Sequence, residues 1–592
     1  MSRVGLIFAL GVFLCGVAHA QPAKTTYEDE RTARALEAAS LKVDEAAEGK
    51  RIAFVRLVRQ EVFADDELMP TVFNLLHRVT DEDVIMRELL VKSGQVFDAR
   101  IANLLAETRR NLRALGIFAL VRVVPVQVST PGEVGVLVYT RDVWSLRLEQ
   151  RLQFNGGQLD ELNLQLTELN LFGRGKKAAA RFQLRPFEYA AGQVYADRRL
   201  LGGELALFES GDLIFERETG GLEGGRVSVR LDKPLRTLDD HWSAGLALLY
   251  DQRIVRQTSG GQLLKYDNPV TPEVESLDRQ WEQRVVGASL GYMRQAGDKT
   301  RYRYGGGLGF SDFSAESEGP LRPLERRRVF PFLSVGGFFP EWRTYTDLAT
   351  YGLSEELRLG PSWSMRVSAP MAALGSTTDG IELDLAVSEV VAIWGDGLLE
   401  GSVGAEADVE RGGHLSQLVY GRARVASPSL HIGRLVSRAD LFARRLGQGR
   451  QASTLVTLGG DNGLRGYPSQ AFHGFGDNLA RASVEWRTRP LVLSSIHLGG
   501  VLFYDAGSVY RDVQTAKVHQ AVGIGARWLV PQFNRVVYRL DVGVPLEGSG
   551  LVLNLSGGSN QATPMTEFED DLYEVDVGGL SVQPSGPAGL LQ

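Results

Sequence analysis

The residue types used in catalysis are present but are not arranged for it. One Gly-x-Ser-x-Gly match occurs at 287–291, centred on Ser289. A serine nucleophile in that motif needs a strand, a sharp turn and then a helix, whereas this match lies within a run of alternating residues. The eight histidines show no metal-ligand spacing, and the acids at Glu355–Glu356 and 569–571 are better interpreted as loop, lumen or tail charges. We predict that the chain is not an enzyme and uses no catalytic residue, metal or cofactor.

The first twenty residues have the features of a secretory signal. Arg3 gives a positive start, 4–17 are apolar, and 18–20 form a small-x-small cleavage site. We expect removal of 1–20 rather than a membrane anchor. The only cysteine, Cys15, lies in this segment, so the mature chain would contain neither disulfides nor a catalytic thiol.

Composition excludes several classes of protein. The net charge of −7 gives no sign of nucleic-acid binding. Glycine accounts for 67 of 592 residues, and because glycine weakens helices, this disfavours an all-helical fold. After residue 20 there is no run of 18 apolar residues, so no transmembrane helix is predicted.

Residues 51–142 are predicted to form a small α/β domain. Apolar periodicity, an acidic helix start and the glycines at 94 and 116 divide it into strand, helix, helix, strand and strand. A polar, helix-friendly leader or linker (21–50) precedes it, and its helix over 27–47 could instead occupy a pore. The expected elements are strand 52–58, helix 81–91, a helix capped by Asp98, strand 118–126 and strand 134–139, with an extra stretch at 60–80.

From 145 to 558 the pattern changes to two-residue alternation. Leu383, Leu385 and Val387, for example, alternate with polar or small residues. Such strands present one face to an apolar phase and the other to water. About sixteen segments of this kind, many about ten residues long, predict a mainly β chain whose larger part is a transmembrane antiparallel barrel. The acidic tail at 559–592 is expected to be disordered.

Two stretches resemble a known superfamily. The sequence RRNLRALGIFALVRVVPVQV at 109–128 resembles a POTRA domain, the periplasmic module of outer-membrane assembly and two-partner secretion proteins. The run NLFGRG at 170–175 resembles the turn that closes the first hairpin of their barrels. The resemblance implies a periplasmic domain followed by an outer-membrane barrel of the BamA/TamA, or bacterial surface antigen, type.

The sharpest resemblance lies near the C-terminus. Leu464-Arg465-Gly466-Tyr467 is similar to the tip of the inward-folded loop that defines this superfamily. Glu485, within NLARASVEWR, and Asp505 and Gly507, within FYDAG, match the motifs of the two strands that follow. By this resemblance, Arg465 would pin the loop to the barrel wall through Asp505 and Glu485. A guanidinium makes bidentate, charge-assisted bonds to carboxylates, and glycines let the loop turn sharply.

The resemblance implies assembly or translocation of proteins at the outer membrane. The expected partners are unfolded outer-membrane or secreted clients, membrane lipid and accessory periplasmic proteins, with no nucleic acid. A client would add a strand to the edge of the POTRA-like sheet. The predicted edge strand is Val134, Gly135, Val136, Leu137, Val138 and Tyr139.

Two other functions stay open at this point. A two-partner secretion transporter would serve one dedicated substrate, and helix 27–47 would plug its lumen. A passive channel or surface antigen would conduct steadily and bind no client. The chain carries a single POTRA-like segment and lacks an aromatic residue at its C-terminus, and both features depart from the central assembly factor.

Overall fold

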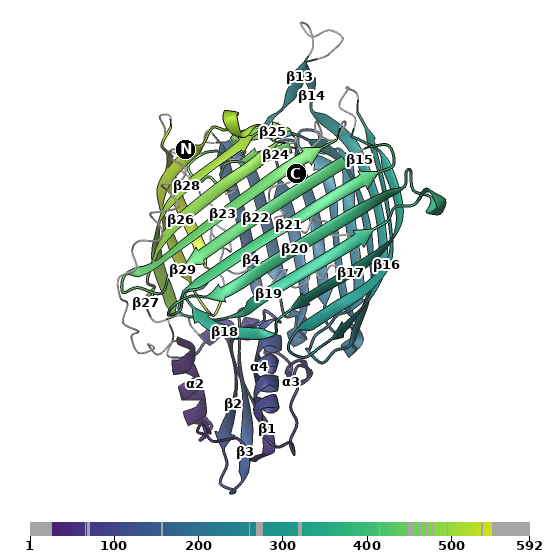
Figure 1. The fold of residues 1–592 in the computed structure, drawn as a ribbon. Helices are drawn as coiled ribbons and strands as arrows, with labels where there is room; N and C mark the ends of the chain where they lie inside the picture. Colours follow the sequence, from purple (N-terminus) through teal and green to yellow (C-terminus); the bar gives the residue numbers. More distant parts are fainter. Residues whose placement is uncertain are drawn as a thin grey trace.

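The computed structural model describes residues 27–547, except for 66, 68–70, 156–157, 260, 268–275, 318–322, 414, 448–454, 461–462, 469, 476, 494, 534 and 536. The described chain forms a small α/β domain and a large closed barrel, with the domain against one end of the barrel (Figure 1). Within these residues, no helix is both long enough and apolar enough to cross a membrane. The expected signal segment and tail, and residues 548–558 of the expected barrel, lie outside the described residues.

The α/β domain has the predicted order of elements. They are β1 (Arg51–Gln60), the 3-10 helix η1 (Thr71–Leu76), α3 (Glu82–Met86), α4 (Ala99–Arg113), β2 (Phe118–Gln127) and β3 (Glu133–Asp142). The side chain of Asp98 caps α4 by accepting from the backbone N–H of Ile101 at 2.8 Å. Helix α3 is shorter than the predicted 81–91, and the chain between it and α4 is extended near Val96, which bridges to Arg51.

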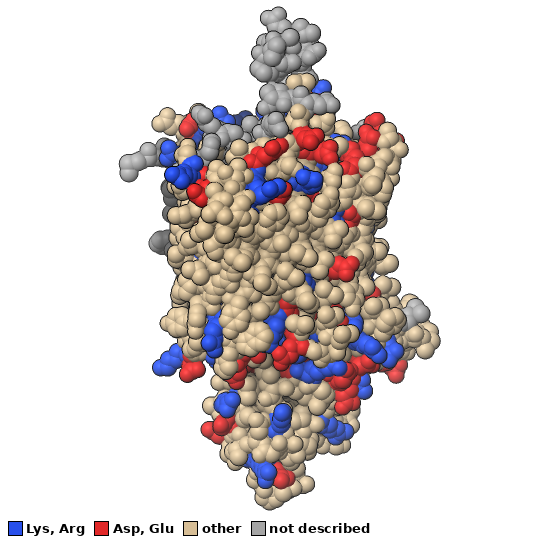
Figure 2. All heavy atoms as spheres, turned by 90° about the vertical axis from the view of Figure 1, so that its right-hand side faces the viewer, with Lys and Arg blue, Asp and Glu red and all other residues tan. Residues whose placement is uncertain are grey.

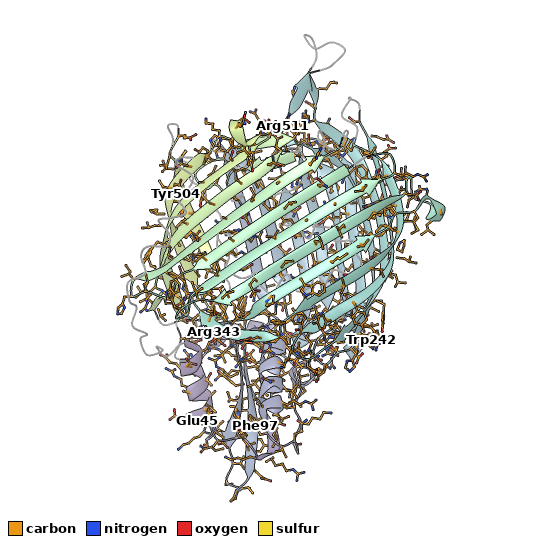
Figure 3. The ribbon with its side chains drawn as sticks, in the orientation of Figure 1. Glu45, Phe97, Trp242, Arg343, Tyr504 and Arg511 are labelled. Atoms are coloured by element: carbon orange, nitrogen blue, oxygen red, sulfur yellow. The ribbon has the colours of Figure 1, made fainter. Side chains whose placement is uncertain are left out.

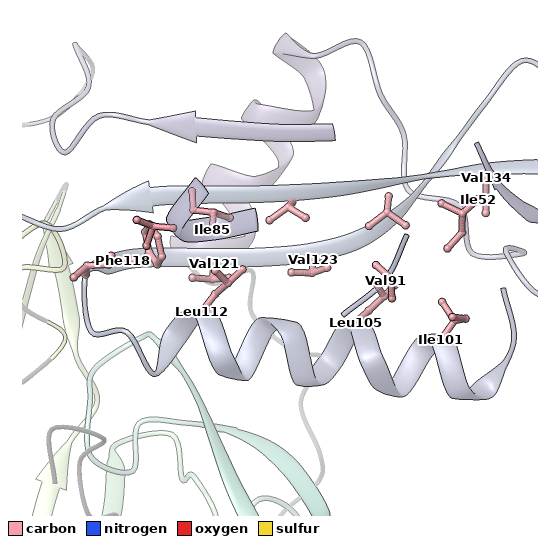
Figure 4. Packing of buried hydrophobic residues seen from close by; sticks show 14 of the residues in the cluster. Ile52, Ile85, Val91, Ile101, Leu105, Leu112, Phe118, Val121, Val123 and Val134 are labelled. Carbon is pink, nitrogen blue, oxygen red and sulfur yellow. The ribbon is translucent and has the colours of Figure 1, made fainter. Parts of the chain in front are cut away.

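One face of α4 builds the core of this domain. Ile101, Leu105 and Leu112 recur at helical spacing and are buried against the sheet (Figure 4). Val121 and Val123 of β2 meet them from the sheet side. The apolar periodicity seen in the sequence is therefore the contact surface between helix and sheet.

The prediction that 134–139 form an edge strand is wrong. The sheet order is β1-β3-β2, so β3 is central, parallel to β1 and antiparallel to β2. Val134, Val136 and Tyr139 are fully buried, and the backbone of the strand is paired on both sides. The outer strands of the sheet are β1 and β2.

Helix α2 (Tyr27–Ala38) covers the other face of the sheet. Ala35 packs with Leu120, Leu137 and Tyr139 in a second apolar cluster. Glu28 is buried and forms ion pairs with Arg122 at 3.0 Å and Arg113 at 3.4 Å. The helix thus lies beside the domain, outside the barrel (Figure 1).

The barrel contains twenty-one described strands in one closed order. They are β4 (Leu146–Asn155), β5 (Gln158–Glu168), β6 (Lys176–Leu184), β7 (Glu188–Asp197), β8 (Ala206–Glu216), β9 (Leu222–Lys233), β10 (Trp242–Arg256), β15 (Gln280–Ala296), β16 (Arg301–Glu316), β17 (Arg326–Phe338), β18 (Glu341–Thr346), β19 (Ser354–Ser368), β20 (Gly380–Ala392), β21 (Leu398–Glu410), β22 (Leu415–Ala426), β23 (Gly433–Leu446), β26 (Asn478–Thr488), β27 (Leu491–Leu493), β28 (Ile496–Tyr510), β29 (His519–Leu529) and β30 (Tyr538–Pro545).

This number exceeds the predicted sixteen or so for two reasons. Strands β18 and β27 continue β17 and β26 after short breaks, and each pair shares one antiparallel neighbour. Strands such as β6 and β7 contain runs of alanine, which give weak alternation. Sequential hairpins connect the barrel strands, and the ends of the sheet meet where β30 lies next to β4.

Short hairpins and 3-10 turns lie in the connections at the barrel ends. Two short hairpins extend the β10–β15 connection, and 3-10 turns close several others. They are β11 (Thr258–Ser259), β12 (Gln262–Leu263), β13 (Lys265–Asp267), β14 (Ser276–Asp278), η2 (Leu171–Gly173), η3 (Leu200–Gly202), η4 (Ala372–Leu374) and η5 (Val513–Thr515).

The outer wall of the barrel is apolar, as the alternation predicts. In β20, Leu385 and Val387 are exposed, whereas Glu382 forms an ion pair with Arg326 at 3.5 Å. Figure 2 shows a broad zone with few charged residues between two charged rims. Trp242, near the domain end of the barrel in Figure 3, stacks on Tyr292 at 6.1 Å. An apolar zone bordered by aromatic rings is the surface expected of a membrane barrel.

Candidate functional site

The connection between β23 and β26 folds back against the barrel wall. It contains the hairpin of β24 (Leu455–Leu458) and β25 (Phe472–Phe475). Leu458, Leu464 and Tyr467 of this loop pack against residues of the wall, among them Leu418 and Ala521. The described residues of 447–477, called the inner loop below, are therefore anchored by apolar contacts on both sides of the tip at Arg465.

Arg465 is the polar anchor of the inner loop, and its side chain is buried. Its Nε and Nη2 donate to the two carboxylate oxygens of Asp505, each at 2.8 Å. Its backbone N–H donates to the same carboxylate at 3.0 Å. The guanidinium also lies 3.7 Å from the centre of the Phe503 ring, a cation–π distance. One carboxylate on β28 thus holds both the side chain and the backbone of the loop tip.

Two further carboxylates complete the coordination of Arg465. Its Nη1 lies 2.8 Å from Glu485 on β26 and 3.4 Å from Asp541 on β30. Ser483, also on β26, accepts from Nη2 at 3.2 Å and donates to Asp505 at 2.7 Å. Three wall strands therefore converge on one loop residue.

Other arginines balance these acids. Arg487 pairs with Glu485 through Nη2 at 2.7 Å. Arg527 and Arg539 pair with Asp541 at 2.6 Å and 3.0 Å. All of these groups are buried. Breaking a buried ion pair by removing one partner is far more costly than losing a surface pair, so the cluster holds the loop in one position.

The electrostatics of Arg465 follow from this arrangement. Burial alone would lower the pKa of the Arg465 guanidinium, but the carboxylates of Asp505, Glu485 and Asp541 outweigh burial and raise the pKa above its usual value. The arginine therefore stays charged at any physiological pH.

Glycines bring the loop tip against the wall. Gly466 has a φ of +97°, a conformation that side-chain-bearing residues rarely adopt. A Cβ on Gly543 of β30 would lie 2.6 Å from the backbone nitrogen of Gly466, and a Cβ on Gly507 would lie 2.8 Å from Leu458. Tyr467 donates its hydroxyl to the backbone carbonyl of Gln520 at 3.2 Å. The tip thus contacts β30, β28 and the end of β29.

A second inserted segment lies at the domain end of the barrel. The turn at 347–354, between β18 and β19, is largely buried, including Leu348, Tyr351 and Leu353. Arg487 donates to the carbonyl of Leu348 at 2.7 Å, and the His497 ring meets the carbonyl of Tyr351 at 2.5 Å. Glu485 forms ion pairs with both Arg465 and Arg487, so ion pairs and the hydrogen bond to Leu348 connect the inner loop to this turn.

A known protein family matches the part of the chain that contains this site. Residues 446–549 match the model of the Omp85 superfamily domain. The chain carries an Omp85 superfamily domain. The match spans the inner loop and the five described wall strands that follow it, β26 to β30. The superfamily resemblance predicted from the sequence is therefore confirmed, and the barrel is an outer-membrane barrel.

Solved structures show similarity over most of the chain. BamA from Haemophilus ducreyi lacking POTRA domains 1-3 is 13% identical with a TM-score of 0.33, and the alignment covers 87% of each chain. CdiB from Acinetobacter baumannii is 11% identical with a TM-score of 0.38, covering 87% of this chain and 72% of that one. CdiB from Escherichia coli is 11% identical with a TM-score of 0.37, covering 87% and 78%. No curated protein matches the chain.

The structure brings the predicted barrel residues of the Omp85 domain together. Arg465, Glu485 and Asp505 are in direct contact, and Gly466, Tyr467 and Gly507 line the packed loop tip. The sequence prediction did not include Asp541, nor the balancing arginines. Asp541 stands in an alternating run with Arg539, which was a signal for a lumen-facing position, but the register of β30 was needed to place it beside Arg465.

The other residues considered for catalysis or metal binding have structural roles in strands, turns and ion pairs. The Gly-x-Ser-x-Gly match lies within β15, where the buried Ser289 has strand on both sides and no helix follows. Glu355 accepts hydrogen bonds from the backbone N–H groups of the turn at 348–350. Glu356 forms an ion pair with Arg109 of α4. Within the described ranges, no group of three metal-binding side chains occurs.

Proposed function

We propose that this protein inserts unfolded polypeptides into the outer membrane or translocates them across it. The α/β domain, a single periplasmic POTRA-like module, would receive the client, and the barrel would insert or export it. The observation that supports this most directly is the inner loop held at Arg465 by Asp505, Glu485 and Asp541. A buried cluster of this kind costs desolvation energy, which suits a loop that must hold a defined position during transport.

The lumen contents support transport over passive conduction. The inner loop packs against the wall, and the turn at 347–354 is buried at the periplasmic end. A passive channel has no need of a loop and a turn that buried contacts hold in fixed positions. We therefore rank a passive channel or surface antigen below an assembly or translocation factor.

The position of α2 favours general assembly over dedicated secretion. A two-partner secretion transporter was expected to plug its lumen with this helix. Instead, Glu28 of α2 pairs with Arg113 and Arg122 of the α/β domain, and Ala35 packs on the sheet. These contacts give α2 a role in closing the face of the domain.

Client capture would use an outer strand of the sheet, since β3 is central. The ends of β2 are already occupied, because Gln127 donates to the carbonyl of Lys42 and Arg535 donates to that of Ala119. The start of β1 is paired through Ile52 with the carbonyl of Gln95. The backbone edges left for an added strand are the later part of β1 and the middle of β2.

Photocrosslinking in cells tests the proposal. A photoreactive residue replaces Arg56, which is exposed on β1, or Val124 on β2. Glu45, which is exposed in the segment between α2 and β1 and lies away from the barrel, serves as the control (Figure 3). We expect crosslinks to several unfolded outer-membrane proteins from one edge and none from Glu45. One dominant secreted product would favour dedicated secretion. Equal labelling at all three positions, or no client at all, would contradict the proposal.

A further inference from the structure

The 3-10 helix η1, between β1 and α3, exposes three apolar side chains. In η1, Val72 is 60% exposed, Leu75 is 84% exposed, and Phe73 is partly exposed. The polar Asn74 points inward, where its amide donates to the carbonyl of Phe63 at 2.9 Å and accepts from the N–H of Phe63 at 3.1 Å. In water the opposite orientation would be favoured. The segment is oriented for an apolar surrounding.

This segment lies at the periplasmic end of the first barrel strand. The ring of Phe73 meets that of Trp144 edge-on at 6.4 Å, and Trp144 is two residues before β4. Phe63 and Phe533 join the same aromatic cluster, with ring centres 5.6 Å apart. The next outward residues of β4, Leu146 and Leu148, are exposed on the lipid-facing wall. The apolar side of η1 therefore continues the lipid-facing surface of the barrel.

A neighbouring barrel turn presents a further apolar residue. Phe172, in the turn between β5 and β6, is exposed. The turn is held to the domain because the N–H of Asp81 donates to the carbonyl of Gly173 at 2.8 Å. Arg78 lies beside Gly173, with its Cγ 3.3 Å from where a Cβ would stand, and most of its side chain is exposed. Apolar groups thus flank a cationic side chain at the level where the barrel meets the domain.

We infer that Val72, Phe73 and Leu75, together with Phe172, insert into the periplasmic leaflet of the outer membrane, with Arg78 at the level of the phosphates. The partner is a phospholipid bilayer surface, because the patch is continuous with a wall that already faces lipid. Exposed apolar groups beside a basic residue are the composition of an interfacial membrane anchor. The contact fixes the α/β domain against the membrane next to the meeting point of β4 and β30. It does not depend on which client the protein handles.

Depth-dependent fluorescence quenching tests this contact in the full chain. Cys15→Ser removes the only native cysteine, and Leu75→Cys then carries a single environment-sensitive fluorophore. The protein is reconstituted in phosphatidylcholine vesicles, with or without lipid carrying a nitroxide near the top of the acyl chain. Leu148→Cys on β4 is the lipid-facing control. Val96→Cys, 56% exposed at the far end of the domain, is the water-facing control.

We expect the label at position 75 to be quenched at least half as strongly as the label at 148, and the label at 96 to remain unquenched. The emission maximum of the label at position 75 should also lie at a shorter wavelength than that of the label at position 96. The substitution Val72→Ser, which leaves the aromatic cluster intact, should reduce quenching at 75. A label at position 75 that behaves like the label at 96, in a protein whose label at 148 is quenched normally, overturns the inference.

Discussion

Arg465 and Asp505 form a bidentate pair inside the barrel, and the backbone N–H of Arg465 donates to the same carboxylate. One residue of β28 therefore fixes both the side chain and the main chain of the inner loop. Charge-assisted bidentate bonds are directional, so they fix the orientation of the tip as well as its position. A lysine could supply the charge but not the fork of donors.

Arg465→Ala should release the inner loop. It leaves Asp505, Glu485 and Asp541 with one positive partner fewer in a buried site, for which a loss of about 3–5 kcal/mol is typical. We expect faster hydrogen exchange at 455–475 and reduced client insertion, while the heat-resistant barrel band on gels persists. Arg465→Lys should recover only part of the protection. Arg411→Ala, at an exposed loop arginine, is the control, and loop exchange equal to wild type in Arg465→Ala would refute the lock.

Asp541→Asn tests the carboxylate that the sequence prediction missed. Asp541 contacts Arg465, Arg527 and Arg539, so its neutralisation should leave excess positive charge beside the loop. A double-mutant cycle with Arg465→Ala should give a coupling energy of about 0.5–3 kcal/mol, the range seen for residues within one network. The measurement is thermal unfolding in detergent. Additive effects on stability would mean that Asp541 interacts only with Arg527 and Arg539 and not with Arg465.

Gly543→Ala should displace the loop tip without changing any charge. The added Cβ would lie 2.6 Å from the nitrogen of Gly466, and overpacking of this kind costs about 1–3 kcal/mol. We expect increased hydrogen exchange around Arg465 and a lower unfolding temperature. Gly401→Ala in β21 is the matched control, because an added Cβ there meets no atom within 4 Å. Equal effects of the two alanines would show that backbone propensity, not the contact with Gly466, is being measured.

Tyr351→Ala should open the end of the lumen next to the α/β domain. The Tyr351 ring is buried and fills the space next to Gly499, where a Cβ would lie 2.6 Å from it. Removing a buried aromatic ring leaves a cavity and costs about 3–5 kcal/mol, so the turn at 347–354 should loosen. We expect larger and more frequent conductance steps in planar bilayers than for wild type. Tyr302→Ala, at an exposed outer-wall position, should leave the conductance unchanged.

Sequence patterns predicted the fold class because alternation and helix periodicity are local properties. The order of strands within a sheet is not local, and this is why β3 was mistaken for an edge. Its run of apolar residues on both faces, from Val134 to Tyr139, was the available signal, since a strand that alternates poorly is usually buried on both sides. The parallel pairing of β1 with β3 is possible because α3, α4 and β2 separate the two strands in the chain.

Residues of the candidate site that stand in short motifs could be predicted from the sequence. Residues that reach the site through the pairing register of the strands could not. Arg465, Glu485 and Asp505 stand in short motifs whose order along the chain is informative. Asp541 and Arg527 come together because β29 and β30 pair in a register that sets Gly525 opposite Asp541. The contact between Arg487 and Leu348 joins residues 139 positions apart. Neither contact can be predicted from the spacing of these residues in the sequence alone.

Docking of α2 on the α/β domain should weaken in acid. Burial would raise the pKa of Glu28, but Arg113, Arg535 and Arg122 outweigh it and lower the pKa from 4.5 to about 2. A carboxyl with a lowered pKa stabilises the docked state fully above its undocked pKa, and this contribution is lost as pH falls from about 4.5 towards 2, on the order of 3 kcal/mol in all. A fluorophore at Glu37→Cys, exposed on α2, would report release as a fall in anisotropy over that window. Glu28→Gln should release the helix already at neutral pH and abolish the acid step, whereas Glu30→Gln, at an exposed position on the same helix, should keep it. An acid step that survives in Glu28→Gln would assign the pH dependence to another group.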